Sequence, residues 1–350
     1  MAARESPDPP LEITYKNLIS GTTQNYRRPE LPVVEECELP LIDLKELDLG
    51  DSEKNLACKK LIAEASREWG FFQVINHGIP SHVLEIMRAE QVKLFEKPFE
   101  EKKTYKDLNF SAGSYRWGTP SATNVNQLSW SEAFHVPLSD ILASGPNIHN
   151  NTLSSTMEQF AARVSELAKK LAGILAEEIG KKTGFFEETC LPSSCYIRLN
   201  RYPVCPVVVQ HPQMLGIMPH TDSDFVTVLQ QDGIGGLQLV KDGNWIAVKP
   251  NPHALIINIG DLFQAWSNDV YKSVEHRVVA NAEKERFSAA YFYCPSKDTV
   301  IESDVYKRFS FGEFKKQVED DVQTFGHKIG LSRFLVPPGG SSSSSLSGGL

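Results

Sequence analysis

Apolar side chains recur at helical spacing in the first part of the chain and predict two amphipathic helices. The first covers residues 55–67, with Asp51 or Ser52 as its N-cap. The second is capped by Ser81 and ends near Pro98, because proline cannot continue a helix. The positions that we expect these two helices to bury are Leu56, Leu61, Ile62, Ala65, Leu84, Met87, Leu94 and Phe95.

The longest helical pattern runs from residue 153 to residue 179 and stops at Gly180. It carries no chemically distinctive side chain, so we expect it to support a sheet from behind. A terminal helix is predicted over residues 311–325.

The pattern changes to short strands in the second half of the chain. The predicted strands cover residues 39–44, 70–78, 195–202, 225–229, 236–240, 245–248, 254–259, 271–279 and 287–293. Two of them flank Lys241-Asp242-Gly243-Asn244, which is typical of a hairpin turn. Alternation along residues 195–202 places Tyr196, Arg198, Asn200 and Tyr202 on one face. Closely spaced short strands predict an antiparallel sandwich or barrel.

These patterns divide the chain into five regions and predict a mainly β fold with supporting helices. We expect residues 1–36 to lie loosely on the surface or hang free, and residues 37–190 to form a helical and mixed N-terminal region. A β core over residues 191–300 is followed by a C-terminal helix region over 301–336. Residues 337–350, with their serine run, are a low-complexity tail.

Composition narrows the class of protein. The chain has 350 residues, 41% of them hydrophobic and 23% charged, as in an average globular protein. A net charge of -8 argues against a nucleic-acid partner, and no apolar run approaches the roughly 20 residues of a membrane span. The N-terminus has no secretory pattern, and the six cysteines form no C-x-x-C pair. We therefore expect a cytoplasmic or nuclear protein with reduced thiols.

The chemically richest stretch is Pro219 to Phe225, which contains His220 and Asp222. In a strand these two side chains point to the same face. A second imidazole from His276, in a distant strand pattern, would complete a set of two nitrogens and one carboxylate. Such a set leaves other positions open and suits non-haem Fe(II) that activates oxygen.

Arg286 and Ser288 form another pair spaced to share a face. A guanidinium and a hydroxyl together hold a carboxylate through charge-assisted hydrogen bonds. The metal set and this carboxylate clamp are what an oxygenase that uses a 2-oxo acid requires.

Residues 111–137 mix aromatic, glycine and polar residues without a clean period. Two readings stay open, an irregular packed connection or a wall of the substrate pocket. We interpret His135 and His77 as structural residues rather than metal ligands.

Several motifs together resemble the plant 2-oxoglutarate- and Fe(II)-dependent dioxygenases. They are Asn-X-Tyr-Pro at 200–203, His-X-Asp at 220–222, His276, Arg-X-Ser at 286–288, and the segments 69–78, 235–239 and 258–261. The resemblance spans residues 37–335 and implies a double-stranded β-helix, or jelly roll. Residues 111–118, 128–137, 219–225 and 258–275 further resemble gibberellin 2-beta-dioxygenases, in the subgroup that acts on 20-carbon gibberellins.

The resemblance implies a role for each motif. His220, Asp222 and His276 hold Fe(II), and 2-oxoglutarate and O2 are cosubstrates, with ascorbate in support. Arg286, Ser288 and Tyr202 bind the far carboxylate of 2-oxoglutarate. The small-molecule gibberellin is hydroxylated on the beta face of C-2 and so inactivated. Arg116 and Arg198 are candidates for binding its carboxylate.

Three alternatives stay open at this point. The first is a dioxygenase of the same family for a flavonoid or for another gibberellin position. The second is a binding protein that keeps the jelly roll without turnover. The third is a zinc hydrolase with the same three ligands, which has no use for Arg286 and Ser288. The oligomeric state is left open.

Overall fold

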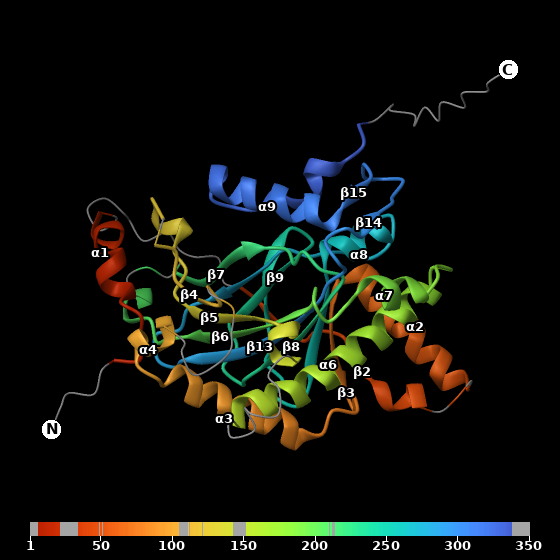
Figure 1. Cartoon of the computed structure of the whole chain (residues 1–350), viewed down its shortest axis with the longest axis horizontal. Helices are drawn as coiled ribbons and strands as arrows, with labels where there is room; N and C mark the ends of the chain where they lie inside the picture. Colours follow the sequence, from red (N-terminus) through yellow and green to blue (C-terminus); the bar gives the residue numbers. More distant parts are fainter. Residues whose placement is uncertain are drawn as a thin grey trace.

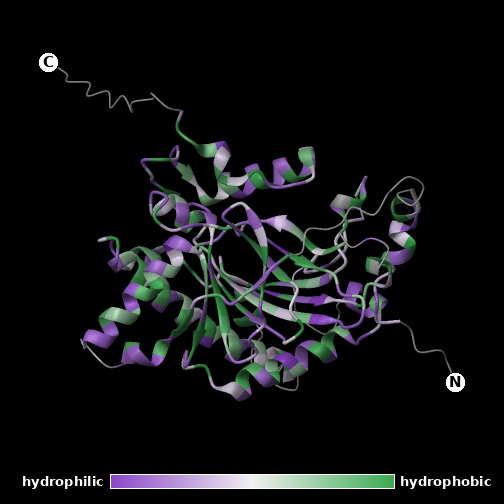
Figure 2. Ribbon diagram, turned by 180° about the vertical axis from the view of Figure 1, so that it is seen from behind, coloured by the Kyte–Doolittle hydropathy of each residue, from purple (hydrophilic) through white to green (hydrophobic). Residues whose placement is uncertain are grey.

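The computed structural model describes residues 6–21, 34–48, 50, 52–104, 111, 113–120, 122–142, 152–209, 211 and 214–337. Two sheets form its centre and helices cover the outside (Figure 1). Hydrophobic residues concentrate along the central strands, whereas the outer helices alternate hydrophobic and hydrophilic residues (Figure 2). No helix in these ranges is long and apolar enough to cross a membrane.

The larger sheet has eight strands in the order β2-β3-β11-β8-β13-β6-β5-β4. Their bounds are β2 Leu41–Asp43, β3 Phe71–Ile75, β4 Tyr115–Trp117, β5 Glu132–Pro137, β6 Tyr196–Tyr202, β8 Val226–Gln231, β11 Leu255–Ile259 and β13 Arg286–Tyr293. Except for the parallel β2–β3 pair, neighbouring strands are antiparallel.

The smaller sheet has five strands in the order β1-β10-β9-β12-β7. Their bounds are β1 Glu36–Cys37, β7 Leu215–His220, β9 Leu237–Lys241, β10 Asn244–Val248 and β12 His276–Val279. The predicted hairpin is confirmed: β9 and β10 are antiparallel, and Asp242 and Gly243 between them both have positive φ. A separate pair is formed by β14 Val300–Ile301 and β15 Phe309–Ser310.

The two sheets pack face to face through an apolar layer. The larger sheet contributes Phe71, Tyr202 and Ile256, and the smaller sheet contributes Leu239 and Val278. This double-layered arrangement confirms the predicted jelly-roll core.

Helices cover the outer face of the larger sheet. They are α2 Glu53–Glu68, α3 Ser81–Phe95, α6 Thr152–Glu177 and α7 Gly184–Thr189. The long helix α6 contacts α2, α3, β8 and β13, so the prediction that it supports the sheet from behind is confirmed (Figure 1). The remaining helical elements are α1 Leu11–Gly21, α4 Phe99–Thr104, α5 Leu138–Leu142, α8 Asp261–Trp266, α9 Phe311–Phe325, and the 3-10 turns Leu44–Asp48, Val125–Gln127, Pro206–Val209 and Gly330–Phe334.

The buried face of α2 was predicted correctly for Ile62 and Ala65 but wrongly for two leucines. Leu56 and Leu61 are each 52% exposed, while Asn55, Cys58 and Ile62 are buried. Asn55 lies on the buried side because its side-chain amide donates to the carbonyl oxygen of Leu47 at 2.7 Å. A polar residue with a specific backbone partner thus shifts the inner face away from the two leucines.

Two smaller predictions also need correction. Ser81 is the first residue of α3 rather than its cap, a position that Pro80 takes without a side-chain hydrogen bond. The strand predicted from Tyr271 begins only at His276. Tyr271 instead donates its hydroxyl to the carbonyl oxygen of Leu175 at 2.8 Å, which ties this segment to α6.

Residues 11–21 are not loose, contrary to the prediction for the N-terminal segment. They form α1, whose Leu11 and Tyr15 are buried against Trp130 and Met214. The tyrosine hydroxyl accepts from the backbone N–H of Thr119 and donates to the carbonyl oxygen of Ser129. The other regional boundaries stay predictions, and residues 338–350 of the proposed tail lie outside the described residues.

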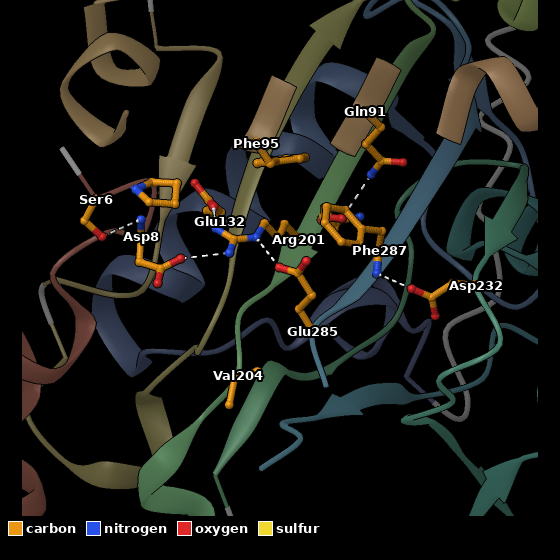
Figure 3. A network of polar contacts seen from close by, with 12 residues as sticks. Ser6, Asp8, Gln91, Phe95, Glu132, Arg201, Val204, Asp232, Glu285 and Phe287 are labelled. Atoms are coloured by element: carbon orange, nitrogen blue, oxygen red, sulfur yellow. Dashed lines mark hydrogen bonds and ion pairs between the residues drawn. The ribbon is translucent and has the colours of Figure 1, made fainter. Parts of the chain in front are cut away.

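A buried ionic network joins the N-terminal segment to the larger sheet (Figure 3). Glu132 binds Lys102 at 2.6 Å and Arg201 at 2.7 Å, and Arg201 also reaches Asp8 at 2.8 Å and Glu285 at 2.9 Å. The Lys102 ammonium donates to the carbonyl oxygens of residues 95 and 7 as well. Burial lowers the pKa of Lys102, and the carboxylate of Glu132 opposes this shift.

Replacing Lys102 by Met should destabilise the protein strongly, because it leaves the buried Glu132 carboxylate with one cation fewer. Breaking a buried pair in this way costs about 3–5 kcal/mol. The matched control is Lys103→Met, whose exposed pair with Glu100 is worth about 0.5 kcal/mol. Urea unfolding of both variants measures the difference, and equal loss of stability in the two would contradict this account of the network.

Candidate metal and cosubstrate site

Two neighbouring strands of the smaller sheet bring His220 and His276 together. His220 is the last residue of β7, His276 is the first of β12, and the two are directly opposite in the antiparallel register. Their ring centroids are 4.3 Å apart. Asp222 follows in the loop after β7, so it does not share a strand with His220 as predicted.

The three side chains nevertheless converge on one point. Oδ1 of Asp222 lies 3.7 Å from Nε2 of His220 and 3.8 Å from Nε2 of His276. One ligand atom of each residue lies within 4.8 Å of the other two, and no other such group of His, Cys, Asp or Glu occurs among the described residues. The spacing matches three ligands around a single ion.

Hydrogen bonds fix which atom each residue presents. Nδ1 of His220 lies 2.8 Å from the carbonyl oxygen of Met218, and Nδ1 of His276 lies 3.0 Å from that of Val274. A carbonyl only accepts, so each Nδ1 carries the proton and each Nε2 has a free lone pair. This is the usual outer-shell arrangement of metal-binding imidazoles.

The carboxylate of Asp222 is oriented in the same manner. Its Oδ2 accepts from Thr227 Oγ1 and from Asn258 Nδ2, both at 2.7 Å. Oδ1 is thereby left to face the two imidazoles. Sequence reasoning missed both positioning residues, although Asn258 stands in a motif that carried the family resemblance.

The protonation states also suit a cation. Burial would raise the pKa of Asp222, but the neighbouring imidazoles and the two hydrogen bonds outweigh it and hold the pKa at about 2. Burial, together with the charge of His276, lowers the pKa of His220 to about 3. At neutral pH the site therefore has a carboxylate and an unprotonated His220 imidazole, and its two-nitrogen, one-oxygen donor set fits Fe(II) with open positions.

A buried arginine with unpaired N–H groups, Arg286, lines the same cavity as this triad. Arg286 on β13 is 3% exposed, and its Nη2 donates to Gln231 Oε1 at 2.8 Å. Its Nε and Nη1 are buried and have no hydrogen-bond partner among the described residues. Unpaired buried guanidinium N–H groups are costly, so Arg286 has donors available for an anionic partner such as the far carboxylate of 2-oxoglutarate.

Ser288 and Tyr202 lie beside Arg286 as predicted. The Arg286 guanidinium lies 4.9 Å from the centroid of the Tyr202 ring, and the two residues are opposite each other across β13 and β6. Ser288 is buried, and its Oγ accepts from Asn200 Nδ2 at 3.3 Å. All three line a cavity of about 60 Å³ that the metal triad also lines.

The remaining candidates separate into two groups. Arg198 lines the same cavity and donates from Nε to Asn200 Oδ1 at 2.8 Å, whereas Arg116 is exposed on the edge strand β4 and is outside the lining. His135 stacks on Tyr196 with centroids 4.0 Å apart, and neither it nor His77 joins the triad. Residues 115–117 and 132–137 extend the larger sheet at its edge without lining the cavity, which favours the packed-connection reading there.

Comparison with known proteins identifies the family. Residues 193–295 match the 2OG-Fe(II) oxygenase superfamily, and residues 39–152 match the N-terminal region named for the non-haem dioxygenase in morphine synthesis. Gibberellin 2-beta-dioxygenase 8 of Arabidopsis thaliana is 58% identical over 341 residues, which cover 94% of this chain and 98% of that protein. The chain belongs to the 2OG-Fe(II) oxygenase superfamily.

Two further similarities agree with this assignment. Gibberellin 2-beta-dioxygenase 6 of Oryza sativa subsp. japonica is 46% identical over 349 residues, covering 94% of this oxygenase and 96% of the relative. A crystal structure of JOX2 in complex with 2OG, Fe and JA has a TM-score of 0.72 and 30% sequence identity, covering 95% of this chain and all of that one. The oxygenase uses Fe(II) and 2-oxoglutarate, as expected from its sequence.

Asp222→Ala should weaken metal binding by at least about a hundredfold, because it removes the anionic ligand and leaves only imidazoles. Calorimetric titration of the metal-free protein with Mn²⁺ measures the affinity without turnover. His253→Gln, at an exposed position away from the triad, is the control and should bind as the wild type does. Undiminished binding by Asp222→Ala would remove this carboxylate from the metal shell.

Proposed function

We propose that this oxygenase is a gibberellin 2-beta-dioxygenase that acts on 20-carbon gibberellins and inactivates them. The observation that carries the proposal is the placement of the His220, Asp222 and His276 triad beside the unpaired N–H groups of Arg286 in one small cavity. The gibberellin assignment is supported by the names of the relatives that are 58% and 46% identical over nearly their whole length.

In this proposal His220, Asp222 and His276 hold Fe(II), and Arg286 holds 2-oxoglutarate by its far carboxylate. With both bound, the centre would use O2 as the oxidant: one oxygen atom would convert an unactivated C–H bond to C–OH, and the other would enter succinate as 2-oxoglutarate loses carbon dioxide. The protein positions the reactants and excludes water from them. Leu229, Val278 and Phe292 give the cavity the apolar walls that this exclusion needs.

The cosubstrate position follows from the pairing of strands. Gln231 accepts from Nη2 of Arg286 and leaves the N–H groups of Nε and Nη1 without a partner among the described residues. These two nitrogens face different edges of the planar guanidinium, so the far carboxylate of 2-oxoglutarate would bind along one edge of Arg286 rather than to Nε and Nη1 together. The hydroxyls of Ser288 and Tyr202 add hydrogen bonds at the same end. A 2-oxo acid anchored there has its keto-acid end directed to the triad, because both groups line one cavity.

Substrate recognition requires a cation near the metal, because gibberellins carry carboxylates. Arg198 lines the cavity between the metal triad and the edge of the sheet, and we assign it to the substrate. Arg116 lies further out on β4 and has a secondary role in this proposal.

A product assay tests the function directly. The protein is incubated with Fe(II), ascorbate and 2-oxoglutarate together with 20-carbon gibberellins, 19-carbon gibberellins or a flavanone, and products are identified by mass spectrometry. We expect a 2-hydroxylated 20-carbon gibberellin whose formation depends on 2-oxoglutarate. Turnover of the flavanone alone would retain the iron chemistry and reject the gibberellin assignment, and no turnover at all would favour a binding protein.

Arg286→Lys tests the cosubstrate clamp. Lysine keeps the charge but lacks the planar pair of donors, so the Kd for 2-oxoglutarate should rise at least about tenfold. Calorimetry with Mn²⁺ in place of Fe(II) measures it. Arg308→Lys is the matched control, because this arginine is exposed and its ion pair among the described residues is with Glu302. An unchanged Kd in Arg286→Lys would assign the carboxylate to another residue.

A further inference from the structure

Three polar side chains that line the metal cavity are joined by hydrogen bonds. Arg198 and Asn200 are on β6 and Ser288 is on β13, and all three line the cavity that the triad and Arg286 share. Nε of Arg198 donates to Oδ1 of Asn200 at 2.8 Å, and Nδ2 of Asn200 donates to Oγ of Ser288 at 3.3 Å. Asn200 therefore connects the arginine that we assign to the substrate with the serine that we assign to the cosubstrate.

These hydrogen bonds run in one direction only. A guanidinium has donors and no acceptor, so the atom of Asn200 that faces Arg198 has to be the amide oxygen. The amide nitrogen then faces Ser288, and because it only donates, the serine oxygen accepts from it. The proton of the serine hydroxyl is not used in this contact and is left to donate to a third group. Arg198 thus fixes the orientation of the amide, and the amide in turn makes Ser288 a donor.

The backbone keeps Asn200 and Ser288 beside each other. The two residues are directly opposite in the register of β6 and β13, and they are 4% and 3% exposed. Gln91 of α3 donates from Nε2 to the carbonyl oxygens of both, at 3.0 Å and 2.9 Å (Figure 3). This glutamine is itself 2% exposed. A buried side chain that binds both strands holds the amide of Asn200 within reach of the serine hydroxyl.

The direction of one proton has a large effect on the binding of an anion. Arg286 and Ser288 are two residues apart on β13 and line the same cavity, so a carboxylate bound to Arg286 lies near the serine hydroxyl. A hydroxyl whose proton points to a carboxylate forms a charge-assisted hydrogen bond with it. If the proton points away, the oxygen lone pairs face the carboxylate and repel it.

We propose that Asn200 is a positioning residue for 2-oxoglutarate, which turns the hydroxyl of Ser288 so that its proton points to the far carboxylate. The proposal rests on the proposed function, in which Arg286 and Ser288 hold that carboxylate. The same amide engages Nε of Arg198 and leaves the edge formed by Nη1 and Nη2 for a carboxylate of the substrate. One buried amide thereby orients a donor at each of the two anion-binding positions of the cavity.

Asn200→Asp tests the orientation without a change in side-chain size. The new carboxylate still accepts from Arg198, but it offers Ser288 an acceptor in place of a donor, so the serine proton turns away from 2-oxoglutarate. We expect the Kd for 2-oxoglutarate to rise at least about tenfold, measured by calorimetry on the Mn²⁺-loaded protein without gibberellin. Asn244→Asp adds the same charge at an exposed position of β10 and is the matched control, with an unchanged Kd.

A second background separates the proton from the added charge. A negative charge near the cavity weakens the binding of an anion whatever Ser288 does, so the titration is repeated in Ser288→Ala. With no hydroxyl to turn, Asn200→Asp should raise the Kd less than about threefold relative to Ser288→Ala alone. Equal factors in the two backgrounds would mean that Asn200 does not act through Ser288, and the proposal would be overturned.

Arg198→Met provides an independent variant should Asn200→Asp disturb the fold, which thermal unfolding detects. It removes the donor that fixes the amide, so the Kd for 2-oxoglutarate should rise about threefold when Ser288 is present and stay unchanged in Ser288→Ala. An arginine that serves only the substrate would leave this Kd unchanged in both backgrounds when no gibberellin is added. That result would reject the role of Arg198 and Asn200 in orienting the hydroxyl.

A failure of the proposed function has a different outcome. If Arg286→Lys leaves the Kd for 2-oxoglutarate unchanged, the far carboxylate lies elsewhere, and the proposed cosubstrate position and the role of Asn200 are both rejected. If Arg286→Lys raises the Kd while Asn200→Asp does not, only the role of Asn200 is rejected.

Discussion

The antiparallel register between β7 and β12 is the constraint on which the site depends. It sets His276 opposite His220, and the pairing of β12 with β9 on its other edge holds the same residue opposite Leu239. A shift by one residue would turn His276 to the other face of the sheet and leave one imidazole facing the metal position. The register of a central strand, fixed on both edges, is therefore as much a part of the metal site as the ligands are.

The close contact between the sheets adds a second condition. A side chain on Gly216 of β7 would lie 2.5 Å from the ring of Tyr202, so glycine is required there for the smaller sheet to approach β6. This approach brings the Tyr202 ring next to the Arg286 guanidinium and encloses the cavity that both residues line together with the triad. The enclosed guanidinium then keeps two N–H groups unpaired, at a cost of about 1–3 kcal/mol for each buried group. β13, which carries Arg286, is paired with β8 on one edge and with β6 on the other. The strand is therefore not free to shift and give the guanidinium other partners.

Short-range patterns predicted one half of the site and strand pairing supplied the other. The spacing of Arg286 and Ser288 and the alternation from Tyr196 to Tyr202 are local, and both placed the side chains on the correct face. Gln231 acquires its role only through Arg286 on another strand, and Thr227 through Asp222 in the loop before β8, neither of which a local period encodes. The two leucines wrongly expected to be buried in α2 have a similar origin, because the hydrogen bond from Asn55 to Leu47, outside the helix, is not visible in the apolar pattern.

The loop that carries Asp222 shows how the C-terminal region enters the site. Lys328, beyond α9, donates to the carbonyl oxygen of Thr221 at 2.9 Å and to Ser223 Oγ at 2.7 Å, the residues on either side of the ligand. Its ammonium also pairs with Asp261 at 2.6 Å, and both side chains are at least nine-tenths buried. Asp261 in turn donates its backbone N–H to the carbonyl oxygen of Asp222. The loop lacks the support of a strand ladder, so these contacts take its place, and the ligand geometry depends on a region that contributes no ligand.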